Sequence, residues 1–241
     1  MIELYYYPSP NGMKIAIMLE ECALPFRLRF VDITRGEQFD PRFLTISPNN
    51  KIPAIVDLSA PGGPLALFES GAILTYLGDL TGRFLPQDLP GRHRCLQWLF
   101  WQVGGLGPMA GQAHHFRAFA SEHVPYGIRR YTDEVNRLYG VMNRQLTDHE
   151  WLAGDYSIAD MACYPWIMPH ERQGQRLDDF PNLRRWFDAM GARAGVQRGL
   201  AWGNERRADE VGHTHLYAQT AATVAAATAT FDAARTPGDK P

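Results

Sequence analysis

Cysteine is scarce in this chain of 241 residues, which contains Cys22, Cys95 and Cys163 and no others. The three lie far apart in apolar segments, so they provide no disulfide framework. No Cys/His spacing typical of a metal site is present, and His114-His115 alone is better explained as a polar patch. We therefore expect a protein of the reducing cytoplasm that binds no metal.

Long apolar runs and an excess of one charge are also missing. No stretch of about 18 apolar residues occurs, so no membrane span is expected. The first residues lack a basic segment followed by an apolar one, so no secretory signal is expected either. With 24 basic and 26 acidic residues the formal net charge is −2, which gives no electrostatic reason to expect a nucleic acid or a membrane as partner.

The first part of the chain alternates between strand-like and helix-like segments. Apolar and charged residues alternate in Phe26–Asp32, which predicts a strand, whereas the apolar residues of Met13–Cys22 recur at helical spacing. The elements expected in chain order are Ile2–Tyr7, Met13–Cys22, Phe26–Asp32, Pro41–Ile46, Pro53–Leu58, Leu65–Phe68 and Ser70–Leu80. This β-α-β-α-β-β-α order predicts a thioredoxin-like domain over residues 1–83.

The rest of the chain is expected to be helical after a linker at 84–91 that contains two prolines. Four helices are expected in an all-helical domain over residues 92–204, so the fold class is α+β followed by all-α. They cover Arg92–Val103, Tyr126–Leu146, a segment starting at Ser157, and Pro181–Ala194, with Gly104–Pro108 interrupting the first. Residues 205–241 are rich in Ala and Thr, and we interpret them as a mobile tail or a marginal helix.

The loop Pro8–Gly12, between the first strand and the first helix, is the first candidate site. Free backbone donors and the partial positive charge of a helix N-terminus stabilise an anion, including a thiolate. The Ser9 hydroxyl and the Asn11 amide can each donate a hydrogen bond to sulfur. Lowering a thiol pKa by about two units requires roughly 2.7 kcal/mol, which one charge-assisted hydrogen bond of about 1.5–3 kcal/mol and the helix end can supply. The alternative is that both side chains only cap the helix.

The same loop lacks the cysteines that dithiol oxidoreductases of this fold carry. Pro8-Ser9-Pro10-Asn11 stands where those proteins have Cys-x-x-Cys, and Cys22 is more than two helical turns further on. Any thiol chemistry at this loop must therefore use a thiol that arrives with the substrate.

Two further segments complete a candidate ligand site. Pro53 opens a strand, and a cis bond there would expose the Ile52 backbone to an extended peptide; an ordinary trans proline is the alternative. Glu69 and Ser70 open a helix and suit the ammonium and carboxylate of an amino acid, unless Ser70 is simply the N-cap. Together with the first loop, these segments describe one ligand, a small acidic peptide with a thiol in its middle.

Several motifs resemble those of a known family. Ser9–Lys14, Ser47–Ile55 and Phe68–Ile73 are similar to the glutathione-binding segments of glutathione transferases. Trp98–Met109 and Gln112–Phe116 resemble, more specifically, the bacterial nu-class enzymes, which are also described as glutathione-dependent disulfide-bond oxidoreductases. The resemblance covers about residues 1–205 and leaves the tail outside.

The resemblance implies a homodimer and assigns roles to individual residues. Ser9 and Asn11 would lie near the sulfur and act in catalysis. The implied glutathione-binding residues are Asn11, Gln38, Lys51, Ile52, Pro53, Glu69, Ser70 and Arg130.

We expect a glutathione-dependent disulfide reductase that binds glutathione or glutathione disulfide and a small-molecule second substrate. The bound thiolate attacks a disulfide, and a second glutathione completes the exchange. Conjugation of electrophilic carbon, reduction of organic peroxides, and a non-catalytic glutathione-binding scaffold remain as alternatives.

Overall fold

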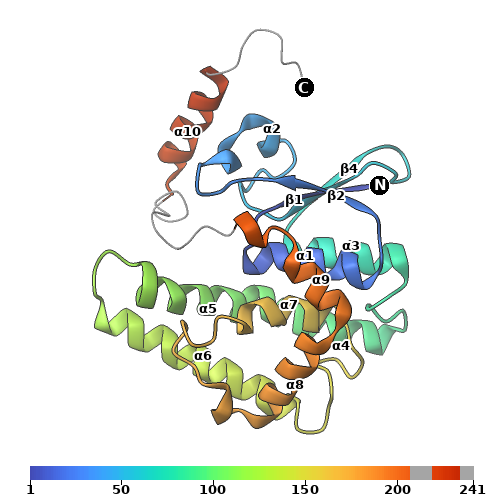
Figure 1. Cartoon of the computed structure of the whole chain (residues 1–241), viewed down its shortest axis with the longest axis vertical. Coiled ribbons are helices and arrows are strands. Elements are labelled where there is room, and N and C mark those ends of the chain that lie inside the picture. Colours follow the sequence, from blue (N-terminus) through green and yellow to red (C-terminus); the bar gives the residue numbers. More distant parts are fainter. Residues whose placement is uncertain (207–218, 234–241) are drawn as a thin grey trace.

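A four-stranded sheet organises the N-terminal half of the molecule (Figure 1). The computed structural model describes residues 1–206 and 219–233. Strand β1 (Ile2–Tyr6) pairs in parallel with β2 (Phe26–Phe30) and antiparallel with β3 (Ala54–Asp57), which pairs antiparallel with β4 (Leu65–Phe68). The strand order is therefore β2-β1-β3-β4, and the expected thioredoxin-like alternation is confirmed.

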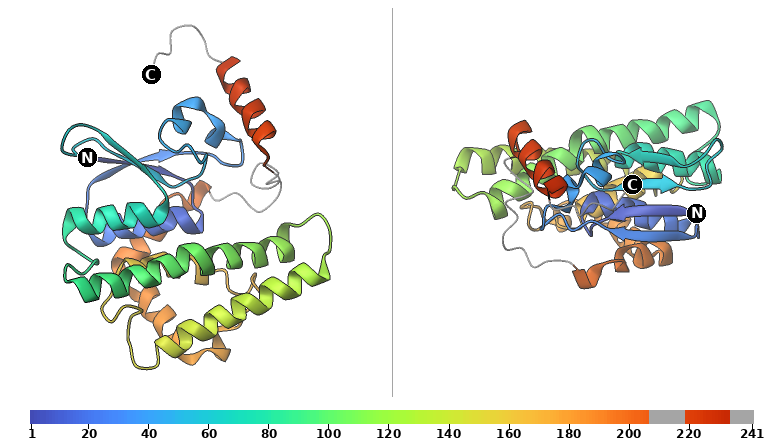
Figure 2. Two further views of the ribbon diagram at one scale, coloured as in Figure 1. Left: turned by 180° about the vertical axis from the view of Figure 1, so that it is seen from behind. Right: turned by 90° about the horizontal axis from the view of Figure 1, so that it is seen from above.

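Helices α1 (Pro10–Glu21) and α3 (Ser70–Thr81) form a layer between the sheet and the helical domain (Figure 2). Helix α1 begins three residues earlier than expected, because Ser9 caps it and Pro10 is tolerated at a first helical position. The helix is buried from Gly12 to Leu19, since α7 and α9 of the other domain pack against the side that faces away from the sheet.

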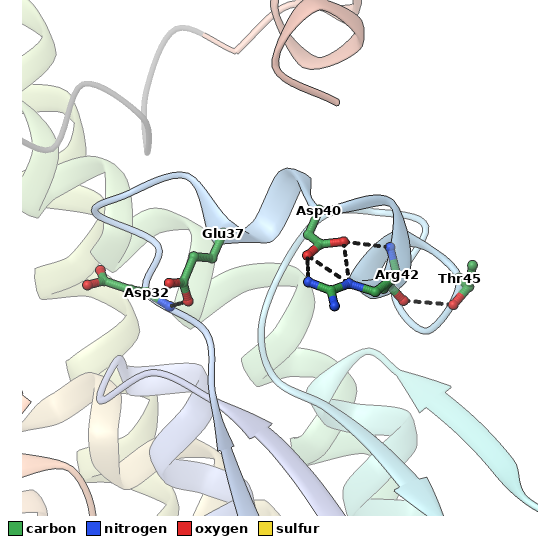
Figure 3. A network of polar contacts seen from close by, with 5 residues as sticks. All are labelled: Asp32, Glu37, Asp40, Arg42 and Thr45. Atoms are coloured by element: carbon green, nitrogen blue, oxygen red, sulfur yellow. Dashed lines mark hydrogen bonds and ion pairs between the residues drawn. The ribbon is translucent and has the colours of Figure 1, made fainter. Parts of the chain in front are cut away.

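A short polar network holds the segment that connects β2 to β3, which contains the 3-10 turn η1 (Glu37–Phe39) and α2 (Pro41–Leu44) (Figure 3). Glu37 accepts a hydrogen bond from the Asp32 backbone N–H at 2.7 Å. Asp40 caps α2 by accepting from the Arg42 N–H at 2.8 Å and pairs with the Arg42 guanidinium. The Thr45 hydroxyl donates to the Arg42 carbonyl at 2.7 Å.

The second domain is helical throughout, but it contains six α-helices within residues 89–206 rather than the four expected. Its elements are α4 (Leu89–Trp101), the π-helical η2 (Gln102–Leu106), α5 (Gly107–His114), the π-helical η3 (His115–Phe119), α6 (Pro125–Gln145), α7 (Ile158–Ile167), the 3-10 turn η4 (Leu177–Asp179), α8 (Pro181–Ala192), α9 (Ala194–Ala201) and the 3-10 turn η5 (Asn204–Arg206).

Two expected boundaries were wrong. The first helix of this domain was expected to begin at Arg92, but α4 begins at Leu89, because Asp88 caps it by accepting from the Gly91 N–H at 2.8 Å. The segment 104–108 was expected to interrupt a helix, but the chain stays helical as a π-helical turn that leads directly into α5. Pro108 lies in the first turn of α5, where a missing N–H is tolerated.

One hydrophobic core runs through both domains and contains side chains of β1, α1, α3, α4, α6, α7 and α8. Helix α10 (Ala221–Ala233) lies apart from this core, beside η1 and α2 (Figure 1). The expected tail at 205–241 is thus helical over residues 221–233, whereas 207–218 and 234–241 lie outside the described residues. Within the described ranges, no helix is both long and apolar enough to cross a bilayer.

Candidate active site

A cavity of about 1540 Å³ lies between the two domains. The sheet domain lines it with the first turns of α1 and α3 and with the loop before β3; the helical domain lines it with η2, α5, η3 and α7. Of the residues expected to bind glutathione, Asn11, Lys51, Glu69 and Ser70 line this cavity. Segments more than 50 residues apart in the sequence therefore meet around one space.

The first turn of α1 carries the candidate catalytic residues. The Ser9 hydroxyl oxygen accepts a hydrogen bond from the Gly12 N–H at 3.3 Å, so Ser9 is a helix cap. A hydroxyl that accepts a hydrogen bond keeps its own O–H to donate, so capping alone does not prevent a contact with sulfur. Ser9 is not among the residues that line the cavity. Asn11 is the second residue of the helix and lines the cavity, and its Oδ1 accepts from the Trp166 indole N–H at 2.9 Å.

The loop before β3 forms a second wall. The Ile52–Pro53 bond is cis, which decides between the two alternatives left by the sequence. Burial lowers the pKa of Lys51. Its ammonium donates to the Gln219 side-chain carbonyl at 3.2 Å, and the Asn50 amide donates to the same oxygen at 3.0 Å. A residue just before α10 thus contacts the side chains at the cavity mouth.

The start of α3 forms the third wall. Glu69 precedes the helix with a φ of 69°, a left-handed conformation that is rare for residues other than glycine and is often found at binding sites. Glu69 makes no side-chain cap, and no acidic residue lies in the first turn of α3. The first backbone N–H groups of α3 therefore have no side-chain cap and provide a positive helix end near the cavity.

Lys14 is a buried lysine that also lines the cavity, and the sequence analysis did not select it as a site residue. Its ammonium donates to the Ser70 hydroxyl at 3.2 Å and to the Gln102 side-chain carbonyl at 2.6 Å, so it links α1 to α3 and to the helical domain. Burial lowers the Lys14 pKa to about 7, against the opposing influence of Cys163 and Glu69. The only signal in the sequence was a lone lysine within an apolar helix.

Other expected glutathione contacts lie away from the cavity lining. Gln38 is 2% exposed and donates through Nε2 to the Ile33 carbonyl at 3.3 Å. Arg130 is exposed on α6. Ile52 and Pro53 are buried and are not among the residues that line the cavity.

The cysteines are poorly suited to nucleophilic chemistry. Burial raises the pKa of Cys22 and of Cys95, and it raises the pKa of Cys163 well above its ordinary value. A nucleophilic cysteine needs the opposite shift, because the thiolate is the reactive form. None of the three lines the cavity.

No metal-binding group is apparent in the ranges 1–206 and 219–233, where no three His, Cys, Asp or Glu side chains gather suitably. His115 lines the cavity, whereas His114 contacts the Phe119 ring at a centroid distance of 4.8 Å. His115 is therefore a residue of the cavity wall, and His114 packs against an aromatic ring.

The fold and the site define the class of protein. Residues 8–80 match the N-terminal domain model of the glutathione S-transferases, and residues 128–194 match the C-terminal domain model. The chain belongs to the glutathione S-transferase family. The disulfide-bond oxidoreductase YfcG of Escherichia coli (strain K12) is 53% identical to it over 203 residues, which cover 83% of this chain and 94% of that protein.

Solved structures agree with this membership. A glutathione transferase from Pseudomonas putida, crystallised with one glutathione disulfide bound per subunit, has a TM-score of 0.80 and 43% identity, covering 83% of this chain and 91% of its own. A glutathione transferase from Burkholderia graminis, with two glutathione molecules bound per subunit, has a TM-score of 0.80 and 44% identity, covering 86% of this chain and 89% of its own.

Proposed function

We propose that this protein is a glutathione-dependent disulfide-bond reductase in which the reacting thiols belong to bound glutathione. The observation that carries the proposal is the position of Asn11. Its amide lies at the positive end of α1 and lines a cavity that no cysteine lines. YfcG, a relative at 53% identity, bears the name disulfide-bond oxidoreductase, which supports disulfides as the second substrate.

The chemistry needs two exchange steps. A glutathione thiolate attacks one sulfur of the substrate disulfide, forms a mixed disulfide and releases one substrate thiolate, which takes up a proton. A second glutathione thiolate then attacks the glutathione sulfur of the mixed disulfide and releases the other substrate thiolate. The products are glutathione disulfide and two thiols. Asn11 and Ser9 stabilise the attacking sulfur anion by hydrogen bonds, and the α1 N-terminus adds its partial charge.

The remaining walls would hold the peptide. The carboxylate of the γ-glutamyl residue binds at the start of α3, where the Ser70 hydroxyl and free backbone N–H groups are available. Glu69 pairs with its ammonium, and the Ile52 backbone pairs with the peptide backbone. Lys51 then attracts the other carboxylate and exchanges its contact with Gln219 for the ligand. Gln38 and Arg130 belong to the proposal only as contacts that the family resemblance implies, since neither lines the cavity.

The proposal includes nu-class membership, a cytoplasmic location and a homodimer. Domain limits of about 1–83 and 92–204 go with it. Exposed aromatic side chains support the dimer, because Phe100 of α4 is 67% exposed and Phe68 of β4 is 37% exposed. Light scattering would measure the mass of the particle in solution, and a monomer at micromolar concentration would contradict the proposed homodimer.

Turnover of glutathione with three substrates tests the function. A model disulfide, an organic hydroperoxide and an aryl halide are compared side by side with the purified full-length protein. We expect the disulfide to give the highest kcat/KM. A higher value for the aryl halide would identify a conjugating transferase instead, and glutathione binding without turnover of any of the three would identify a binding protein.

A cysteine-free variant tests the source of the thiol. Cys22→Ala, Cys95→Ala and Cys163→Ala are combined, and disulfide reduction is expected to stay within about twofold of the parent because burial already suppresses these thiolates. Circular dichroism confirms that the variant is folded. A folded variant without activity would show that a protein thiol takes part.

A further inference from the structure

The indole of Trp166 is the one side chain of the helical domain that hydrogen-bonds to Asn11 in the described part of the chain. Trp166 is near the end of α7, and its Nε1 donates to Asn11 Oδ1 at 2.9 Å across 155 positions of sequence. Both residues line the cavity. The contact joins the first turn of α1 to the opposite wall of the site.

This contact fixes which way the Asn11 amide faces. An indole N–H is only a donor, so the atom of Asn11 that meets it must be the carbonyl oxygen. The amide NH2 group is then directed away from Trp166, and Asn11 can offer a donor to a sulfur anion. With the opposite orientation the carbonyl oxygen would face the sulfur and repel its negative charge. An amide side chain without such a partner can adopt either orientation, because its O and N ends are similar in size.

The Trp166 ring is itself held in place. The Gln173 amide donates to the Trp166 backbone carbonyl at 2.8 Å, which fixes the main chain from which the ring projects. Gly107 and Gly111 of α5 lie against the ring, since a Cβ added at Gly107 would be 3.5 Å from Cε2 and one at Gly111 would be 3.4 Å from Cη2. Glycine at these two positions lets α5 approach the indole closely, which restricts its rotation.

We propose that Trp166 is a positioning residue that holds the Asn11 amide with its NH2 group toward the glutathione sulfur. The proposal rests on the glutathione-dependent function proposed above. The helical domain then contributes to thiolate stabilisation by orienting a residue of the other domain, without its own group touching the sulfur.

Trp166→Phe removes the N–H donor and keeps an aromatic ring. We expect kcat for disulfide reduction to fall about tenfold while the KM for glutathione stays within about threefold. The pKa of the bound thiol, followed by thiolate absorbance in a pH titration, is expected to rise by about one unit. Trp202→Phe is the matched control, because it removes an indole N–H donated to Glu20 at 2.8 Å on the exposed side of α1; its rate and thiol pKa should equal those of the parent.

A double-mutant cycle separates positioning from general damage. If Trp166 acts through Asn11, Trp166→Phe should cost no further rate in an Asn11→Ala background. Equal losses in both backgrounds would overturn the proposal, and so would an unchanged thiol pKa in Trp166→Phe. If the parent binds glutathione and Trp166→Phe leaves the pKa of the bound thiol unchanged, only the role of Trp166 is contradicted. If the parent binds no glutathione, the proposed function itself is contradicted.

A measurement that keeps Trp166 intact covers the case in which Trp166→Phe fails to fold. The chain has six tryptophans, whose indole N–H signals are resolved by nitrogen-15 NMR. Asn11→Ala should shift one of them upfield as its hydrogen bond is lost. If no indole signal moves, the contact is absent in solution and the proposal fails.

Discussion

Two helices of this protein begin with a serine and a polar or small residue three positions later, and they use their N-termini in opposite ways. At α7, Ser157 and Asp160 form a capping box in which the Asp160 carboxylate accepts from the Ser157 N–H at 3.0 Å. At α1, Ser9 caps alone and Gly12 stands where α7 has its aspartate. One helix start contains its own counter-charge, and the other has none.

The surroundings of the two helix starts explain the difference. Asp160 is fully buried and also accepts from the Leu152 N–H and the Trp186 indole, so its carboxylate oxygens are used within the protein. The α1 start lies at the cavity wall, and Asn11 there is available to a ligand. A carboxylate in place of Gly12 would repel a thiolate and would also clash, since a Cβ at Gly12 would be 2.3 Å from the Tyr7 carbonyl oxygen. A closed helix start stabilises the fold, and an open one is suited to an anion.

The largest expected effect comes from removing the Asp160 carboxylate from the capping box of α7. Asp160→Ala leaves buried donors from the backbone and from Trp186 without an acceptor, which should lower the free energy of unfolding by about 3 kcal/mol or more. Thermal and urea unfolding measure the loss. An Asp160→Ala protein as stable as the parent but without activity would contradict a purely stabilising role for Asp160.

Removing the Asn11 amide at the start of α1 should lower the rate and leave the stability nearly unchanged, the reverse of Asp160→Ala. Asn11→Ala is expected to lower kcat by about 100-fold, since stabilisation of sulfur matters most as charge develops, while glutathione binding weakens by about threefold. Its unfolding free energy should change by less than about 1 kcal/mol. Steady-state kinetics and calorimetric titration measure both. An unchanged rate would remove Asn11 from the mechanism.

The pH dependence of stability distinguishes the two helix starts, because a buried lysine, Lys14, lies in α1 and a buried carboxylate, Asp160, lies in α7. Burial lowers the Lys14 pKa from 10.5 to about 7, so above pH 7 the unfolded chain binds more protons than the native protein. Stability should therefore rise with pH from about 7 toward 10 through Lys14. Lys14→Met has no ammonium group at this position, so its stability should not rise with pH for this reason.

The measurement is urea unfolding of the parent and of Lys14→Met without glutathione, between pH 7 and pH 9. The cysteine thiols, with their raised pKa values, are protonated in the native state across most of this range. The stability difference between the two proteins should shift in favour of the parent as pH rises. A difference that stays constant would show that Lys14 keeps an ordinary pKa.

The smallest expected effect is the loss of stability when the N-cap serine of either helix is replaced by alanine. Ser9→Ala and Ser157→Ala each delete one N-cap oxygen, which typically costs about 1 kcal/mol. The two should therefore lose similar stability, whereas Ser9→Ala alone should lower the rate of disulfide reduction. Equal rates in both variants would make Ser9 a cap and nothing more.

Local signals predicted much of the fold because they act over a few residues. The alternation in β2 and the helical spacing in α1 follow from which side chains face the core, and both elements were predicted. The segment 104–108 was misjudged because glycine and proline usually end helices. Here the π-helical turn η2 accommodates Gly104 and Gly105 against the neighbouring α5 and α7, and Pro108 lies in the first turn of α5. The number of helices was underestimated for a different reason, because α8 and α9 are separated by a single residue and no local signal marks the break.

The sequence by itself determined the family, the thioredoxin-like order of elements, and the presence of Asn11 at a helix start without a cysteine. These depend on residue types and short spacings. Only the tertiary structure decided that Trp166 orients Asn11 and that Lys14 lies under Ser70. Such contacts join residues that are far apart in the chain, and no local spacing encodes them, because they arise only when two separately patterned domains pack around one core.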